Sequence, residues 1–423
     1  MVRERLSTTE PEQKLQTRLK IMTPPPKKKV CFASQSQSKS DGGQNVDIDP
    51  EVAKKLFKEG AAIVLIDVPP GTEIGIDMNS WNVGEKFLGI KCIPPGIHFV
   101  YYSSVNLPSR SVAPRTGFFY NFGRGEVVVR RWSKQTEEIV DTVSEEDKER
   151  VKGDMRNLDK CMGVFPYQSW KKWISLSDQI SEATLSRLEP GNKTICSVSD
   201  LVPENKDTEG SGATEEDGNE GDPRLPVLVS RPGSNIRYTE LSSRKYPEGS
   251  SPSEITRHGM DGTFHLSVFV SSLQRLYGDA VSSSMSHQNT VSEVLAEIQF
   301  SFLCFLVGMN QDSFEHWKKL VTMMCSCDEG MVQYSDLFMK FVNVLYFQMQ
   351  EVPSDFFVDI VSSNNFLCNC LNTLFANGKN NPDVSAQLKQ KLVRFENNVT
   401  KKFGWDFSQD LDDDAPVVVD LDH

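Results

Sequence analysis

Two cysteine pairs are the residues of this chain whose types could most directly do chemistry. Cys325 and Cys327 are separated by one residue, as are Cys368 and Cys370, and four thiolates would complete a tetrahedral zinc site. Structural zinc sites usually have two to four residues between paired ligands, and side chains two apart on a helix diverge by about 200°. We therefore interpret these cysteines as buried or partly exposed helix thiols and predict no metal, with zinc as the alternative.

The other residues that could do chemistry do not form a catalytic pattern. The histidines are far apart in sequence, and none lies in a His-Glu-x-x-His arrangement. His98 lies inside an apolar run, so we interpret it as a packed residue with satisfied ring nitrogens. The glycines of 71–75 and 123–125 have no following Gly-Lys-Ser/Thr and open no helix, so they are not phosphate loops. We predict no catalytic residue, no cofactor and no enzymatic activity; a triad assembled in space is the alternative.

Nucleic-acid recognition has a weak signal, because Arg130-Arg131-Trp132 and Lys171-Lys172-Trp173 place bases beside aromatic rings. A tryptophan in the core with its neighbours in solvent is the interpretation that we favour for both sequences. The formal net charge of −12 is concentrated in an acidic stretch at 199–222 and in the last 19 residues, and is opposed by a basic first 46. The remaining chain is near neutral, which argues against a large nucleic-acid footprint.

The acidic C-terminal segment has the pattern of a binding element. Several aspartates precede three consecutive valines, which favour a strand but are too few to form a stable sheet alone. The segment either packs on Trp405 and Phe407 of its own domain or adds a strand to the exposed sheet edge of another protein. On the second interpretation the partner-binding residues are Pro416, Val417, Val418, Val419 and Leu421.

The first half of the chain has the pattern of a β-rich domain. Apolar runs at 61–68, 97–104, 117–122 and 126–132 are rich in β-branched and aromatic residues. Pro-Gly or Gly-x-Gly sequences bound these runs, which predicts strands joined by hairpins. From Ser144 onward the signal becomes helical, so we expect helices to pack on the sheet and close a domain that spans residues 48–198.

The second half has a helical period. Apolar residues recur at steps of three and four in 291–305, 314–324, 334–349 and 384–403. Short loops between such stripes predict antiparallel neighbours, hence an all-α domain over 236–407 that is a bundle or a short superhelical stack. No fixed repeat length is visible. The predicted fold class is α+β, with a β-rich N-terminal domain followed by a helical C-terminal one.

Three further segments are predicted not to fold by themselves. Residues 1–47 form a polar extension, 199–235 an acidic linker, and 408–423 an acidic tail. Lys27-Lys28-Lys29 in the extension is either a nuclear-import signal or a solvated charged turn. The longest apolar stretch has about ten residues, fewer than the roughly 20 that cross a bilayer, so no membrane is expected.

Several long blocks resemble one known family. The first blocks are LFKEGAAIVLIDVPPGTEIGIDMNSW, KFLGIKCIPPGIHFVYYSS and PRTGFFYNF; later ones in the same order include YQSWKKWISLSDQISEATLSRL, YPEGSSPSEITRHGMD, FEHWKKL, EVPSDFFVDIVSSNNFL and TKKFGWDF with APVVVDL. These blocks resemble the A1-cistron splicing factor family over roughly residues 49–421, apart from the linker.

The resemblance implies a role in mRNA splicing and mRNA processing. It implies an assembly factor of the U5 small nuclear ribonucleoprotein that acts in the cytoplasm and nucleus. The expected partner is pre-mRNA-processing factor 8, the large U5 scaffold protein, through its RNase H-like and JAB/MPN-like domains. On this expectation the protein acts as a chaperone that delays joining of the spliceosomal helicase. The alternative is a splicing factor that binds RNA directly.

Overall fold

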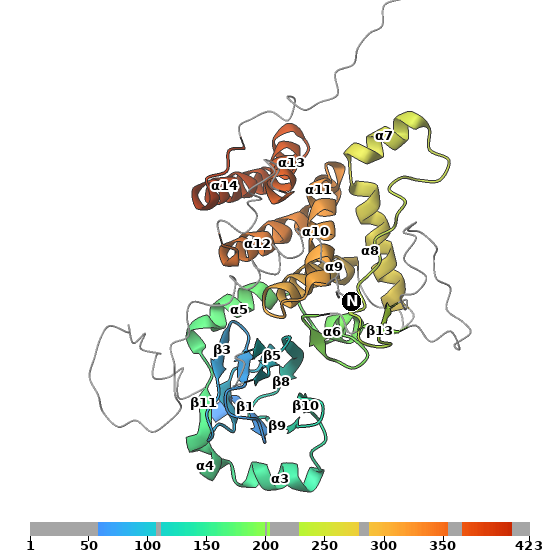
Figure 1. Cartoon of the computed structure of the whole chain (residues 1–423). Coiled ribbons are helices and arrows are strands. Elements are labelled where there is room, and N and C mark those ends of the chain that lie inside the picture. The colour runs from blue at the N-terminus through green and yellow to red at the C-terminus, as the bar shows by residue number, and fades with distance from the viewer. Residues whose placement is uncertain are drawn as a thin grey trace, which may run out of the picture. The chain divides into compact units, whose positions relative to one another are not determined.

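The computed structural model describes residues 58–106, 111–198, 201–203, 228–278, 287–353 and 366–407 (Figure 1). They fall into two compact units. The β-rich unit contains the described residues up to Tyr238 together with 300–314, and the helical unit contains the rest from Thr239 onward. The predicted fold class, a β-rich region followed by a helical region, is confirmed.

The β-rich unit contains two five-stranded sheets. The first has the order β10-β9-β1-β4-β11 and is mixed, because β1 runs parallel to β9 and antiparallel to β4. The second has the order β12-β8-β5-β2-β3 and is antiparallel. The strands are β1 (Ala61–Ile66), β2 (Glu73–Ile76), β3 (Asn79–Asn82), β4 (Gly89–Ile93), β5 (Gly96–Ser103), β8 (Thr116–Phe122), β9 (Val127–Ser133), β10 (Glu138–Val140), β11 (Met162–Val164) and β12 (Ile195–Cys196).

One core is shared by the two sheets. Ile63 and Leu65 of β1 lie in the same buried cluster as Ile74 of β2 and Val100 of β5. The alternate residues of β1 face the other way, where Val64 packs in a second cluster with Val129 and Val143. Side chains of a strand alternate between its faces, so the long apolar run at 61–66 is explained by burial on both faces of β1.

The predicted strands are present, but the interpretation of their turns as hairpins is wrong at three places. The turns after β1, β4 and β8 each lead from one sheet to the other, so the strands that they join are not hydrogen-bonded partners. Hairpins in this region join β2 to β3, through Asp77 and Met78, and β9 to β10. Proline and glycine mark where the chain turns, but strand pairing depends on contacts that are distant in sequence.

A glycine–tyrosine–glycine row runs across the second sheet. Tyr101 of β5 is paired with Gly75 of β2 on one side and Gly117 of β8 on the other. A Cβ atom on Gly75 would lie 2.1 Å from Cζ of Tyr101, and one on Gly117 would lie 2.9 Å from its Cβ. The Tyr101 ring therefore occupies the space over Gly75, while the space over Gly117 is filled mainly by the Phe99 ring, whose Cζ would lie 2.4 Å from that Cβ. Burial raises the pKa of Tyr101 to about 12.

Arg115 covers this row. Its guanidinium carbon lies 4.4 Å from the centre of the Tyr101 ring, and Nη1 donates a 2.8 Å hydrogen bond to the carbonyl of Val307. Nη2 lies 3.4 Å from Oε1 of Glu73, whose carboxylate also accepts from the Ser80 hydroxyl. Tyr101 hydrogen-bonds with Ser80 in turn. The buried Arg115 guanidinium therefore stacks on Tyr101, donates to Val307 and pairs with Glu73. These contacts offset much of the free-energy cost of removing the cation from water.

Residues 300–314 are part of the same unit. Phe300 packs on Phe119 of β8 with ring centres 5.1 Å apart, and the Asn310 amide donates to the carbonyl of Cys196 in β12. Asn310 also accepts from the backbone N–H and hydroxyl of Ser313. The end of one long helix and the start of the next therefore fold with the sheets, although the sequence pattern shows only a continuing helical stripe.

Short helices complete the β-rich unit. Trp173 of α5 donates from Nε1 to the carbonyl of Ile97, 2.7 Å away, which fastens that helix to β5. The sequence predicted helices closing this domain, and they are present. They are α3 (Glu145–Gly153), α4 (Met155–Leu158), α5 (Trp170–Ser177) and α6 (Glu182–Leu188), with single 3-10 turns at Asp159–Cys161 and Tyr167–Ser169.

The helical unit confirms the predicted apolar stripes. Four of its helices coincide with the four stripes. Trp317 donates from Nε1 to the buried Gln348 side chain, 3.0 Å away. α14 pairs with α12 and with α13. The helices are α7 (Pro252–Met260), α8 (Thr263–Gly278), α9 (His287–Leu306), α10 (Gln311–Cys325), α11 (Glu329–Gln333), α12 (Ser335–Glu351), α13 (Phe366–Asn380) and α14 (Ala386–Phe403). The last turns of α9 and the first of α10 belong to the β-rich unit.

The predicted domain boundaries stay a prediction. Within the predicted linker, β13 (Leu201–Pro203) and β14 (Leu228–Ser230) pair as a two-stranded antiparallel ladder. A similar small ribbon joins β6 (Val105–Asn106) and β7 (Ser111–Val112). The predicted extension, with Lys27-Lys28-Lys29, lies outside the described residues. In the described part of the chain, no helix is both long and apolar enough to cross a membrane.

Substituting Gly75 tests the tyrosine row. We expect Gly75→Ala to lower the free energy of unfolding by about 1–3 kcal/mol, because the new methyl group collides with the buried Tyr101 ring. Gly84→Ala is the matched control, since nothing lies within 4 Å of its Cβ position. Urea titrations of both variants give the comparison, and equal midpoints would contradict the close packing.

Candidate functional site

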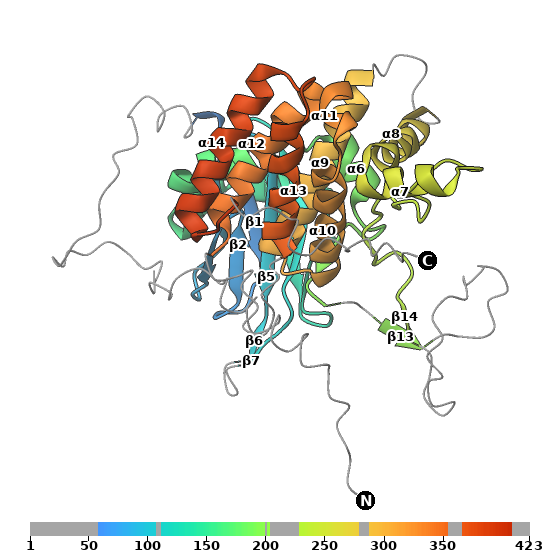
Figure 2. The same cartoon turned by 90° about the horizontal axis from the view of Figure 1, so that it is seen from above.

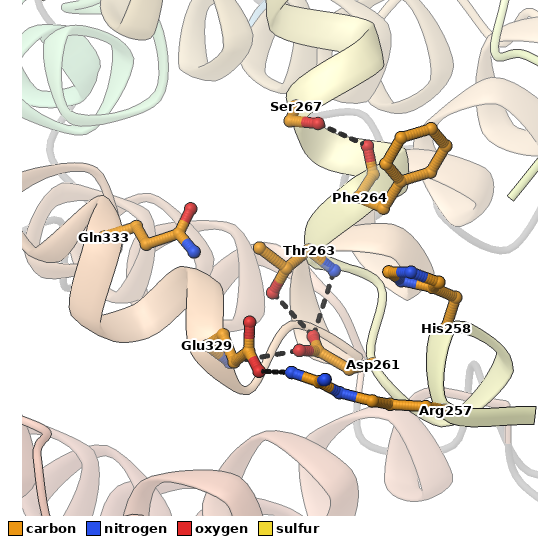
Figure 3. Close-up of a pocket in the computed structure, with 8 residues that line it drawn as sticks. All are labelled: Arg257, His258, Asp261, Thr263, Phe264, Ser267, Glu329 and Gln333. Atoms are coloured by element: carbon orange, nitrogen blue, oxygen red, sulfur yellow. Dashed lines mark hydrogen bonds and ion pairs between the residues drawn. The ribbon is translucent and has the colours of Figure 1, made fainter. Parts of the chain in front are cut away.

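A small pocket in the helical unit gathers the polar side chains that most resemble a site (Figure 3). Its volume is about 210 Å³. The residues come from the end of α7, the start of α8 and from α11, which makes it a corner where three helix ends meet. The lining residues are Arg257, His258, Asp261, Thr263, Phe264, Ser267, Glu329 and Gln333.

The Asp261 carboxylate organises this corner. Oδ1 accepts from the backbone N–H and hydroxyl of Thr263, at 3.0 and 2.6 Å, and from the N–H of Asp328 at 2.9 Å. Oδ2 accepts from the N–H of Glu329 at 3.3 Å. One carboxylate thereby satisfies donors at the starts of both α8 and α11, where a negative charge is also favoured by the helix dipoles. The arrangement holds two helices together.

The rest of the pocket adds partners to this cap. The Thr263 hydroxyl accepts from the N–H of Gly330 at 2.7 Å, and Arg257 forms an ion pair with Glu329 (Figure 3). The Ser267 hydroxyl donates to the carbonyl of Phe264 in its own helix. His258 lies against the Phe264 ring, with centroids 5.5 Å apart. None of the eight lining residues forms a hydroxyl–imidazole pair, so the corner can position helices but presents no nucleophile.

The four paired cysteines lie in or beside α10 and α13. Cys325, Cys327 and Cys370 are buried and Cys368 is half-buried. Burial raises the pKa of each of these thiols, and the Cys327 thiol donates to the carbonyl of Met323. In the described segments no three His, Cys, Asp or Glu side chains are grouped so that they could hold a metal ion. Protonated, buried thiols are poor nucleophiles and poor ligands.

His98 forms a buried pair with Asp77 in the β-rich unit. Nδ1 of His98 lies 2.6 Å from Oδ2 of Asp77, and Nε2 lies 2.8 Å from the carbonyl oxygen of Pro94. A carbonyl only accepts, so Nε2 carries a proton, and one further proton is shared between the imidazole and the carboxylate. Burial raises the pKa of Asp77, and its Oδ1 accepts from the N–H of Phe99.

The surroundings of this pair are apolar and closed. The Trp173 ring stacks on His98 at 6.4 Å, and the Phe165 ring meets it edge-on at 5.3 Å. Both members of the pair are at most 1% exposed. The prediction that His98 is a packed residue with satisfied nitrogens is confirmed. Asp77, Arg115 and Asp261 were not singled out from the sequence; only Asp261, an aspartate two residues before a helix, carries a recognisable capping signal.

The sequence-predicted partner-binding residues Pro416, Val417, Val418, Val419 and Leu421 lie outside the described residues. Their role therefore stays a prediction. Of the aromatics beside bases, Trp132 and Trp173 are buried, at 3% and 1% exposure. This burial bears out the structural interpretation of both tryptophans, since a buried ring has no face on which a base could stack.

The two units together make a two-domain α+β protein, and comparison with known proteins gives its family. A family model described as the AAR2 N-terminal domain matches residues 59–190, and one described as the AAR2 C-terminal repeat region matches 238–408. The human Protein AAR2 homolog is 41% identical over 388 residues, which cover 89% of this chain and 97% of that protein. The mouse homolog is 41% identical over 389 residues, covering 89% and 98%.

A distant relative shows the same coverage. The Caenorhabditis elegans Protein AAR2 homolog is 33% identical over 383 residues, which cover 86% of this chain and 99% of the relative. The chain therefore belongs to the AAR2 family, which is the A1-cistron splicing factor family that its sequence blocks resemble. It is thus a splicing-related factor. The sequence itself shows no fixed repeat length in the region that the second family model describes as a repeat region.

Substituting Asp261 tests its role as a shared cap. Asp261→Ala leaves several helix-end donors without their acceptor, so we expect the free energy of unfolding to fall by about 2 kcal/mol. Asp261→Asn keeps one acceptor oxygen and should lose less. Glu240→Ala, which removes an exposed carboxylate from the same unit, is the control. If all three variants unfold at the same urea concentration, the cap does not stabilise the corner.

Proposed function

We propose that the chain is a non-enzymatic assembly factor of the U5 small nuclear ribonucleoprotein in pre-mRNA splicing. It binds the large U5 scaffold protein, pre-mRNA-processing factor 8, through that protein's RNase H-like and JAB/MPN-like domains. As an assembly chaperone it delays joining of the helicase. The observation that carries the proposal is membership of the AAR2 family over both units, with 97% of the length of the human relative covered.

The described polar clusters suit a binding protein. The Asp261 carboxylate satisfies helix ends, the Asp77–His98 pair is sealed in a core, and Arg115 holds its own unit together. Each of these clusters stabilises the fold. We therefore expect the protein to recognise its partner through exposed surfaces and through its termini. The part of the chain outside its charged segments is near neutral, which favours a protein partner over a nucleic acid.

The acidic tail is the proposed partner-binding element. Pro416, Val417, Val418, Val419 and Leu421 form a short segment that can add a strand to an exposed sheet edge of the scaffold protein. Backbone hydrogen bonds then supply affinity, while alternate side chains such as Val417 and Val419 fill pockets. The protein works in the cytoplasm and nucleus, with Lys27-Lys28-Lys29 as the candidate import signal.

A titration of the full chain with the scaffold's two C-terminal domains tests the function and the tail together. We expect the unmodified chain to bind, and Val418→Pro to bind more weakly because it removes one ladder donor and fixes the backbone. The loss should be of the order of one hydrogen bond or more, about 1–3 kcal/mol. Val418→Thr keeps the N–H and the strand preference, so it should bind like the unmodified chain.

The outcomes separate the possibilities. If the unmodified chain does not bind these domains but binds single-stranded RNA with a strong dependence on salt, it is an RNA-binding factor instead. If it binds the domains and Val418→Pro does so with the same affinity, the function stands, and recognition lies on the folded units. Isothermal titration calorimetry distinguishes these results in one set of samples.

A further inference from the structure

A groove runs between the last two helices of the helical unit. α13 and α14 lie side by side (Figure 2), and the groove between them has a volume of about 260 Å³. Phe375, Gly378 and Leu392 line it. A Cβ atom on Gly378 would lie 2.3 Å from Cδ1 of Leu392, so the two helices approach closely at the floor. We call this feature the α13–α14 groove.

The α13–α14 groove is lined by both apolar and basic side chains. Val393 also lines the groove and is 46% exposed. Covering this valine with another apolar side chain would remove apolar surface from water, which is favourable. Lys379 and Lys389 stand at the rim, with one carboxylate, Glu396, which pairs with Lys379 at 2.7 Å. A segment that fits here needs apolar side chains for the floor and negative charges for the rim.

The described chain ends at this groove. α14 stops at Phe403, and Gly404 caps it in the left-handed conformation with φ of 72°. The chain then turns back, and the ring of Phe407 packs edge-on against Phe375 with centroids 5.0 Å apart. Phe407 is buried. The last described residue, Phe407, therefore lies against a side chain that lines the α13–α14 groove.

The charges of the two helices and of the tail are opposite. α13 and α14 together carry six Lys or Arg and one Glu, a net charge of +5. Residues 408–423 carry six Asp and no Lys or Arg, a net charge of −6 with His423 neutral. The same sixteen residues contain the apolar side chains of Leu411, Val417–Val419 and Leu421. Charge, apolar content and starting point therefore all match the groove.

We propose that residues 408–423 dock in the α13–α14 groove of their own chain when no partner is present. Apolar side chains of the tail cover Leu392 and Val393, and its aspartates lie near Lys379 and Lys389. The reach is sufficient, because an extended chain spans about 3.3 Å per residue while Lys389 and Glu396, seven residues apart on a helix, are about 10 Å apart.

Docking would regulate the tail. On the proposed function, the residues that add a strand to the scaffold protein are the same ones that the groove holds. The partner must then displace the docked tail. Its apparent affinity for the chain is therefore the intrinsic affinity multiplied by the fraction of chains whose tail is free. This consequence rests on the proposed function, but the docking itself does not, since it takes place in the free protein.

Nuclear magnetic resonance of the valine-labelled full chain tests the docking without any partner. We expect the amides of Val417, Val418 and Val419 to have order parameters near those of folded backbone, about 0.85, at low salt. Val393→Asp, which puts a like charge on the groove, should lower them below about 0.6, the range of flexible chain. Val332→Asp, on an exposed valine of α11 that does not line the groove, should leave them unchanged.

A pair of lysine substitutions on one helix separates the groove from general charge attraction. Lys389→Glu, at the rim, should release the tail, whereas Lys401→Glu makes the same charge change on α14 outside the groove and should release it far less. Order parameters below about 0.6 for all three valines in the unmodified chain would overturn the proposal. Docking that grows with protein concentration would also overturn it, because the tail would then occupy a second copy.

Discussion

Burial of the Tyr101 ring is the constraint on which the β-rich unit depends. The ring fits because Gly75 beside it has no side chain, and the Arg115 guanidinium stacks on the ring. A buried cation is costly unless it is paired and hydrogen-bonded. Glu73 and the carbonyl of Val307 supply those partners, so the packing of one aromatic ring requires a segment nearly 200 residues further along the chain.

The same requirement explains the other polar groups in the described chain. Asp77 and His98 neutralise each other inside a core, and Asp261 accepts from the ends of two helices. Buried polar groups are tolerated where each finds a partner. They leave no reactive group poised for chemistry in the clusters described above.

The sequence predicts the elements of this fold well and their partners poorly. The helical stripe at 384–403 could be read directly, because it buries one face of a helix. The stripe at 291–305 also predicted its helix, but Glu293 to Phe305 are buried on all sides, which the stripe alone does not show. Strand pairing could not be read directly, since the turns at Gly71 and Gly123 look like hairpin turns yet cross between sheets. The roles of Arg115 and Asp261 arise from contacts with Val307 and Asp328, and no local pattern reports such distant contacts.

Hydrogen exchange along α9 in the full chain tests most directly whether Arg115 binds the segment 300–314 into the β-rich unit. The helix has one stretch in each unit, His287–Gln299 and Phe300–Leu306. In low urea we predict that amides of the second stretch open together with those of β5 and β8, and that Arg115→Met exposes them first. Exchange of the whole helix as one unit, independent of the strands and of Arg115, would contradict this account.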